Sequence, residues 1–462
     1  MKNTDTKLKK KTHEIDMCNG PILGKMLLFT IPLMFSSVLQ IMFNAADVIV
    51  VGRFAGDNSL AAVGSTTSII SLLTNLFIGL SVGANVLAAR YYGAAKQREL
   101  SQTVHTAMLL SVFSGIFLTV IGCIGAEWIL TAMSTPKEVL QLAVLYLRIY
   151  FLGMTATMIY NFGSAILRAI GDTKRPLYYL IISGIINVCF NLLFVIVFNM
   201  GVAGVAMATV ISQCVSAVLI VRCLIRENSG IHLDIKNLHI DSHKFVNILK
   251  IGLPAGFQGI VFSLSNVVIQ SSVNSFGAVV VAGNSSASNI EGFVYFAMNS
   301  FYQASLSFTS QNVGAGKIER VGKVALCAQA CVLIVGLVLG NVVLLFGRPL
   351  LGIYSSNPEV IDAGITRLSI IARTYALCGM MDVMVGSLRG MGYSIMPMLV
   401  SMIGACGLRI LFIMTLFQIP QLHTMSALYS CYPVTWIVTF AAHVICYVWA
   451  KNKMMKKRGL AV

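Results

Sequence analysis

The sequence predicts an all-α membrane protein in which twelve transmembrane helices form two homologous lobes of six. Composition is the first observation behind this fold class: 57% of the 462 residues are hydrophobic and only 11% are charged, against about 25% charged in an ordinary soluble domain. The second is a series of twelve long apolar runs, and the third is a set of short motifs that occurs twice. So few charges cannot cover this much apolar surface in water, so we expect the chain to cross a lipid bilayer.

Each apolar run is long enough for one membrane-spanning helix, which takes about 20 apolar residues. The runs do not alternate apolar and polar residues, so we expect helices and not the strands of a barrel. They lie near residues 26–51, 60–89, 103–126, 139–161, 177–198 and 202–225, and near 247–272, 279–310, 321–346, 359–387, 397–418 and 427–450. The chain is thereby divided into an N-terminal tail (1–25), a first lobe (26–226), a linker (227–246), a second lobe (247–450) and a C-terminal tail (451–462).

The positions of Lys and Arg predict the orientation in the membrane. Of the 33 Lys and Arg, 26 lie in the tails and in the loops on one side of the predicted bundle, three lie in the opposite loops, and four lie within spans. Because cytoplasmic loops carry the excess of positive charge, we expect both termini in the cytoplasm and the protein in the plasma (inner) membrane. The net charge of +16 is therefore explained by topology, and we expect no nucleic-acid partner.

An internal repeat relates the two lobes. Residues 93–96 read GAAK and residues 314–317 read GAGK, and Leu167-Arg168 is matched by Leu388-Arg389 at the same offset of 221 residues. Pro32 and Asn44 match Pro254 and Asn266 one residue out of step. An offset of six spans keeps both copies in the same orientation, so the repeat is parallel, about an axis along the membrane normal.

Asp47 is the leading candidate for a functional residue, because an ionisable group inside a membrane span is costly and is a functional hypothesis by default. Its carboxylate has little access to bulk water, so it could carry a proton or bind a small cation; it could also simply reach the outer interface. Asn187 and Asn191 lie one turn apart on one helix face, and Thr209 follows in the next span. Together these oxygens could coordinate a monovalent hard cation, although the two Asn could equally be hydrogen-bond partners between helices.

Two further acids lie within the second lobe. Glu291 is in the middle of the eighth span and Asp382 is in the cytoplasmic half of the tenth. Either could provide a second protonation site or a substrate site. Each could instead form a structural ion pair with one of the four arginines inside spans, a choice that the sequence leaves open: Arg148, Arg367, Arg373 and Arg409.

Polar side chains also occur along the spans expected at the centre of the bundle. They should not face lipid, so we expect them to line a wet cavity between the lobes; the candidates are Gln40, Asn44, Asn266, Gln270 and Asn289. Gly79 and Gly83 have the spacing of a helix-packing contact. The chain has no Walker A pattern, so we expect neither ATP-driven pumping nor enzymatic activity, and no cofactor.

These segments resemble the multidrug and toxic compound extrusion (MATE) family over nearly the whole chain. The order, spacing and duplication of the motifs carry the resemblance. The motifs are Ile31-Pro32 with Asp47 and Val51-Gly52, AAVG at 61–64, Gly93-Ala94, Leu167-Arg168 with Gly171-Asp172, GVAG at 201–204 with Thr209, and Leu388-Arg389-Gly390.

The resemblance implies a V-shaped fold of two six-helix lobes with alternating access. It also implies export of amphipathic, often cationic, small molecules in exchange for H⁺ or Na⁺. Asp47 matches the acid of the family's cation site in the first lobe, and Asn187, Asn191 and Thr209 match its neighbours; these four would be the metal ligands if Na⁺ is the coupling ion. Some members carry an acid where Asn191 stands, and the family's acid in the seventh span has no match here, so the choice between H⁺ and Na⁺ stays open.

We therefore expect a monomeric antiporter in the bilayer with a small amphipathic substrate. The closest alternative is a flippase for a lipid-linked precursor on a related two-lobe scaffold, which a large and strongly cationic cavity would favour. A channel or a non-transporting receptor is a third possibility, but the repeat and the acids within spans argue against it.

Overall fold

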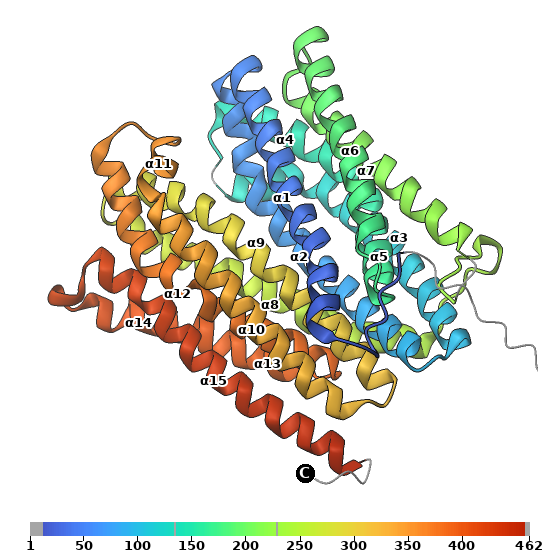
Figure 1. Cartoon of the computed structure of the whole chain (residues 1–462). Coiled ribbons are helices and arrows are strands. Elements are labelled where there is room, and N and C mark those ends of the chain that lie inside the picture. The colour runs from blue at the N-terminus through green and yellow to red at the C-terminus, as the bar shows by residue number, and fades with distance from the viewer. Residues whose placement is uncertain (1–12, 134, 228–229, 458–462) are drawn as a thin grey trace, which may run out of the picture.

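The computed structural model describes residues 13–133, 135–227 and 230–457, which form a bundle of helices joined by short turns (Figure 1). No strand occurs among these residues, so the all-α prediction is confirmed for the described part of the chain. The first lobe contains α1 (Ile22–Phe54), α2 (Asp57–Gly93), α3 (Gln97–Ala132), α4 (Lys137–Leu152), α5 (Met154–Ala169), α6 (Lys174–Leu192), the π-helical turn Leu193–Val197, and α7 (Gly201–Arg226). The second contains α8 (Ser242–Asn274), α9 (Ala278–Gly314), α10 (Ile318–Leu345), α11 (Gly347–Gly352), α12 (Pro358–Gly390), α13 (Ile395–Ser401), the π-helical turn Met402–Gly407, α14 (Leu408–Met414) and α15 (Met425–Lys457).

Twelve long helical segments are found among the described residues. Ten are long and apolar enough to cross a membrane. The α4 and α5 helices are bent by 46° at Gly153 and together make an eleventh candidate span, a break that the apolar run did not reveal. The twelfth segment, α9, has 37 residues, as has α2, but its polar side chains keep it out of the apolar set. Six segments thus belong to each lobe, in line with the predicted twelve.

The same turns join the helices of the two lobes. Gly56 (φ 85°) precedes α2 and Gly277 (φ 92°) precedes α9, while Gly171 (φ 93°) and Gly392 (φ 95°) precede α6 and α13. Each pair is separated by the 221 residues of the sequence repeat. Glycine takes this left-handed conformation without steric penalty, so the glycines that mark the repeat also determine its turns.

The lobes lie side by side, with α1, α2, α8 and α9 between them (Figure 1). They are joined by two equivalent hydrogen bonds at the end where α1 begins and α15 ends, which we call the terminal end. Arg90 donates to the carbonyl oxygen of Gly390 (3.4 Å), and Gln311 donates to that of Ala169 (2.7 Å). The two donors are 221 residues apart, and so are the two acceptors. The repeat axis therefore passes between these contacts.

Residues 13–21 pack between the lobes at the terminal end. Met17 is fully buried, and its carbonyl oxygen accepts a hydrogen bond from Asn312 of α9 (3.1 Å). On the other side, Tyr92 of α2 donates to Glu14 (3.0 Å). This segment contacts both lobes and helps to close the terminal end, so it is more than a polar extension before the first helix.

The contact between α2 and α8 is the most extensive between the lobes. It depends on glycines, because a Cβ atom on Gly79 would lie 2.3 Å from the backbone nitrogen of Gly256, and one on Gly83 would lie 2.3 Å from the carbonyl oxygen of Ile248. Real Cβ atoms do not come this close to backbone atoms. The predicted packing role of Gly79 and Gly83 is therefore confirmed.

Replacing Gly83 with Ala is expected to destabilise the protein, because the added methyl group meets backbone that cannot move aside. Overpacking of this kind costs about 1–3 kcal/mol. Gly64 is the matched control, since it lies on the same helix with no atom near the position of its Cβ; Gly64→Ala is expected to be neutral or to stabilise α2 by up to about 1 kcal/mol. Thermal unfolding in detergent would measure both, and equal midpoints for the two variants would contradict the packing assignment.

Candidate functional site

The candidate site lies where α1 meets α6 and α7. Contact between Phe43 and Gly184 fixes the register of α1 on α6, because a Cβ atom on Gly184 would fall 1.8 Å from the Phe43 ring. Asp47 follows Phe43 by one helical turn, and Asn187 and Asn191 follow Gly184 by one and two turns. The same faces of the two helices therefore bring these three polar side chains together.

Four side chains form a closed ring of hydrogen bonds at this point. Asn191 Nδ2 donates to Asp47 Oδ1 and also to Asn187 Oδ1 (3.2 Å). Asn187 Nδ2 donates to Thr209 Oγ1 (3.4 Å), and the Thr209 hydroxyl lies 3.4 Å from Asp47 Oδ2 and 3.0 Å from the Val205 carbonyl oxygen. The structure thus places all four residues of the predicted cation site in mutual contact. Their role in binding an ion stays a prediction.

The Asp47 carboxylate is buried without a fixed positive charge. Asp47 is only 9% exposed, and its neighbour Asn191 is fully buried. Asp47 forms no ion pair with any residue in the described ranges. Burying a carboxylate without a counter-charge is expensive. Asn191 Oδ1 is also buried and has no hydrogen-bond partner among those residues. The donor set of one carboxylate, two amide oxygens and one hydroxyl fits either a proton on Asp47 or a monovalent hard cation as cargo.

The second lobe does not contain a second copy of this site. Asp47 corresponds to Ile269 at the offset of 222 that relates Asn44 to Asn266. An apolar residue therefore stands where the first lobe has its acid, so the second lobe lacks a carboxylate at the corresponding position.

Glu291 forms a buried ion pair with Arg367. Arg367 Nη2 lies 2.8 Å from Glu291 Oε2, and its Nε lies 3.2 Å from both carboxylate oxygens. Arg367 Nη1 donates to Asn284 Oδ1 (2.7 Å), which also accepts from the Tyr429 hydroxyl (3.3 Å). Of the two alternatives that the sequence left open for Glu291, the structure contains the ion pair. Its carboxylate has a fixed counter-charge, in contrast with Asp47.

Asp382 is half-buried on α12 and forms neither an ion pair nor a hydrogen bond with residues of the described part of the chain. Arg389 lies two turns further along α12, but it donates instead to the Tyr302 hydroxyl and to Gln258 Oε1, both at 2.7 Å. The structure therefore does not provide the structural ion pair that we considered for Asp382. A role in protonation or substrate binding stays a prediction.

The other three arginines within predicted spans take different positions. Arg148 lies 3.5 Å from Glu127 in an exposed pair, and Arg373 is exposed. Arg409 is buried and donates to Thr435 Oγ1 (3.1 Å), with its guanidinium 4.3 Å from the centre of the Tyr432 ring. Arg409 thus contacts two aromatic rings, those of Tyr432 and Trp436, and not the carboxylate of an ion pair.

The five polar candidates for a central cavity lie on α1, α8 and α9. Gln40, Asn44, Asn266 and Asn289 are exposed. Gln270 is half-buried, and its Oε1 accepts from Asn284 (3.0 Å), so it belongs to the network around Arg367. Three aromatic residues of α15 were not among the predicted site residues: Tyr429, Tyr432 and Trp436. Their spacing of three and four residues puts them on one face of the last helix, where they meet Arg367 and Arg409.

Comparison with known proteins places this geometry in context. The model of the MatE family matches residues 32–193 and 254–415, one stretch in each lobe. The probable multidrug resistance protein YoeA of Bacillus subtilis is 28% identical over 442 residues, covering 93% of this chain and 95% of that protein. The probable multidrug resistance protein NorM of Thermotoga maritima is 25% identical and covers 81% of each chain. A solved structure, described as the outward-facing conformation of a multidrug resistance MATE family transporter of the MOP superfamily, has the same fold, with a TM-score of 0.88 at 21% identity, covering 97% of this chain and 99% of that one.

Proposed function

The chain belongs to the MatE family and is an integral membrane transporter, and we propose that it exports amphipathic, cationic small molecules in exchange for H⁺ or Na⁺. One observation carries the antiport proposal: the buried, uncompensated carboxylate of Asp47 within a ring of neutral oxygen donors. Burying this uncompensated negative charge costs free energy, and binding of a proton or a cation lowers that cost. An ion that neutralises Asp47 therefore changes the free energy of the state to which it binds.

Coupling requires that the ion and the drug favour different states. Asp47 lies in the half of α1 away from the terminal end, where Arg90 and Gln311 join the lobes. We infer that an ion reaches Asp47 from the opposite side of the membrane and favours the state that has released the drug. Drug binding from the cytoplasm or inner leaflet then requires the two bonds at the terminal end to break and favours release of the ion.

The substrate class is inferred from relatives and from charge. Two relatives that align with most of the chain carry printed names that describe multidrug resistance. Gln40 and Asn44 on α1 and Asn289 on α9 are exposed and neutral, and the α9 sequence contains no Lys or Arg. A flippase for an anionic lipid-linked precursor would favour a strongly cationic cavity, so drug export is the better-supported proposal.

Purified protein in liposomes provides the test of this proposal. A fluorescent cationic dye is loaded, and a proton gradient or a sodium gradient is imposed separately. We expect one of the two gradients to drive dye movement, and an ionophore that dissipates this gradient to abolish it. Dye movement without any gradient would indicate a channel, and no movement under either gradient would overturn drug antiport in favour of the lipid-linked substrate.

A further inference from the structure

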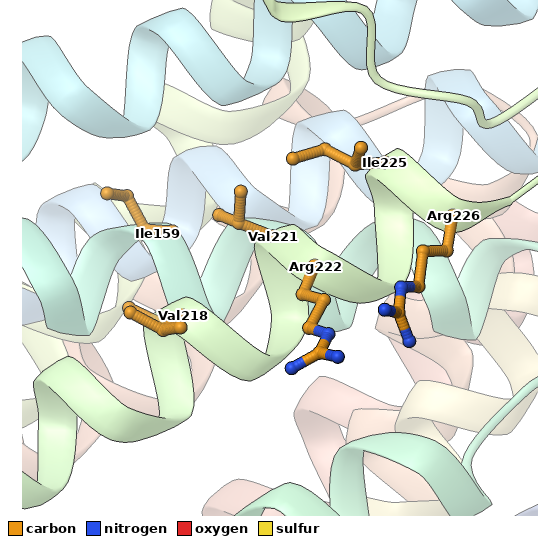
Figure 2. Close-up of a pocket in the computed structure, with 7 residues that line it drawn as sticks. Ile159, Val218, Val221, Arg222, Ile225 and Arg226 are labelled. Atoms are coloured by element: carbon orange, nitrogen blue, oxygen red, sulfur yellow. The ribbon is translucent and has the colours of Figure 1, made fainter.

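A groove on the outer surface of the first lobe combines an apolar lining with two arginines. It has a volume of about 490 Å³ and is lined by Ile159 of α5 and by residues from the last three turns of α7 (Figure 2). The lining residues from α7 are Ala217, Val218, Val221, Arg222, Ile225 and Arg226. The guanidinium groups are the charged groups of this lining, and they lie at its terminal-end side.

Arg222 and Arg226 are one helical turn apart, so both reach from the same side of α7, as Figure 2 shows. Both are exposed, and neither forms an ion pair or hydrogen bond with residues in the described ranges. The adjacent acid, Glu227, is engaged elsewhere, because it pairs with Arg175 at 2.5 Å; Arg175 also pairs with Asp172. Two guanidinium groups with unused donors therefore face outward at one point.

This arrangement matches the two chemical parts of an anionic phospholipid. Guanidinium groups bind phosphate oxygens in bidentate fashion, and the end of a membrane-spanning helix is where lipid phosphates lie. Further from the terminal end, Val218 and Val221 line the groove and could contact an acyl chain; Val218 is 64% exposed. A free phosphate would use the arginines alone, whereas a lipid would use both the arginines and the apolar wall.

We propose that this groove is a binding site for an anionic phospholipid on the cytoplasmic leaflet, with its phosphate on Arg222 and Arg226 and an acyl chain along Val218 and Ile159. The site is separate from the Asp47 ring, which lies in the other half of the membrane and faces the interior of the lobe. Basic pockets at the cytoplasmic ends of membrane helices recognise lipid headgroups in this way. Occupancy would stabilise α7 against α5.

The test compares lipids on delipidated full-length protein in detergent. Phosphatidylglycerol, phosphatidylcholine with the same acyl chains, and glycerol 3-phosphate are titrated while the thermal unfolding midpoint is recorded. We expect phosphatidylglycerol to raise the midpoint of the unmodified protein, phosphatidylcholine to raise it less, and glycerol 3-phosphate to leave it unchanged. A response to glycerol 3-phosphate equal to that of the lipid would overturn the lipid assignment.

Two variants and a matched control complete the test. Arg222→Gln with Arg226→Gln is expected to weaken the apparent affinity for phosphatidylglycerol about tenfold or more, because it removes the phosphate donors. The control, Lys453→Gln with Lys456→Gln, removes the same charge from exposed positions on α15 and is expected to retain the response. Val218→Trp fills the groove while both arginines remain and should also weaken binding. An unchanged lipid response in the arginine variant, or in Val218→Trp, would overturn the proposed site.

Discussion

Replacing Asp47 with Asn is expected to reduce ion-driven efflux by about 5–150-fold and to leave the protein folded. This fold-change corresponds to typical coupling free energies of about 1–3 kcal/mol. Asn has nearly the same shape as Asp, and its oxygen can still accept the hydrogen bond that Asn191 donates. Its amide can donate toward the Thr209 hydroxyl in place of the bond that Asp47 accepts. The substitution therefore removes the charge while the packing of α1 on α6 and α7 is kept.

The measurement is dye efflux from liposomes under the gradient that drives the unmodified protein. Asp362→Asn is the matched control, because Asp362 is an exposed acid on the surface of the second lobe, paired with Arg348 at 2.7 Å, and should be dispensable. A folded Asp47→Asn protein has an unchanged thermal unfolding midpoint or a higher one, since an uncompensated buried charge has been removed. Full gradient-driven efflux by such a protein would remove Asp47 from the coupling mechanism.

The residues around Asp47 could be predicted because their signals are local and survive in a single sequence. An acid within an apolar run is conspicuous, and the one-turn spacing of Asn187 and Asn191 already places both on one face of a helix. The contact of that face with α1 could not be derived from periodicity. It depends on the fit of Phe43 against Gly184, a pairing between spans that are far apart in the sequence.

The second lobe was harder to predict because its charges interact over long distances. Glu291 and Arg367 are 76 residues apart, and four arginines within spans were equally suitable partners on the sequence alone. The bend at Gly153 and the packing of residues 13–21 between the lobes follow from tertiary contacts that composition does not encode.

Replacing Arg367 with Met is expected to destabilise the protein by about 3–5 kcal/mol, because Glu291 would be left buried and unpaired. Asn284 and Tyr429 would also lose the guanidinium around which they are arranged. Arg348→Met is the control, since the pair that Arg348 forms with Asp362 is exposed and is worth about 1 kcal/mol or less. Thermal unfolding in detergent compares the two variants, and a similar loss of stability in both would contradict the importance of the buried pair.

The double variant Arg367→Met with Glu291→Gln separates a structural role of Glu291 from a role in proton transfer. Removing both charges eliminates the unpaired carboxylate, so we expect the double variant to recover much of the stability that Arg367→Met alone loses. If Glu291 serves only to hold α9 against α12, the double variant should also retain gradient-driven efflux, and Glu291 would then be dispensable for coupling. If stability returns while efflux does not, Glu291 takes part in transport despite its fixed counter-charge. The pair would then have to open during the transport cycle, as the proposed mechanism also requires of the bonds that Arg90 and Gln311 form at the terminal end.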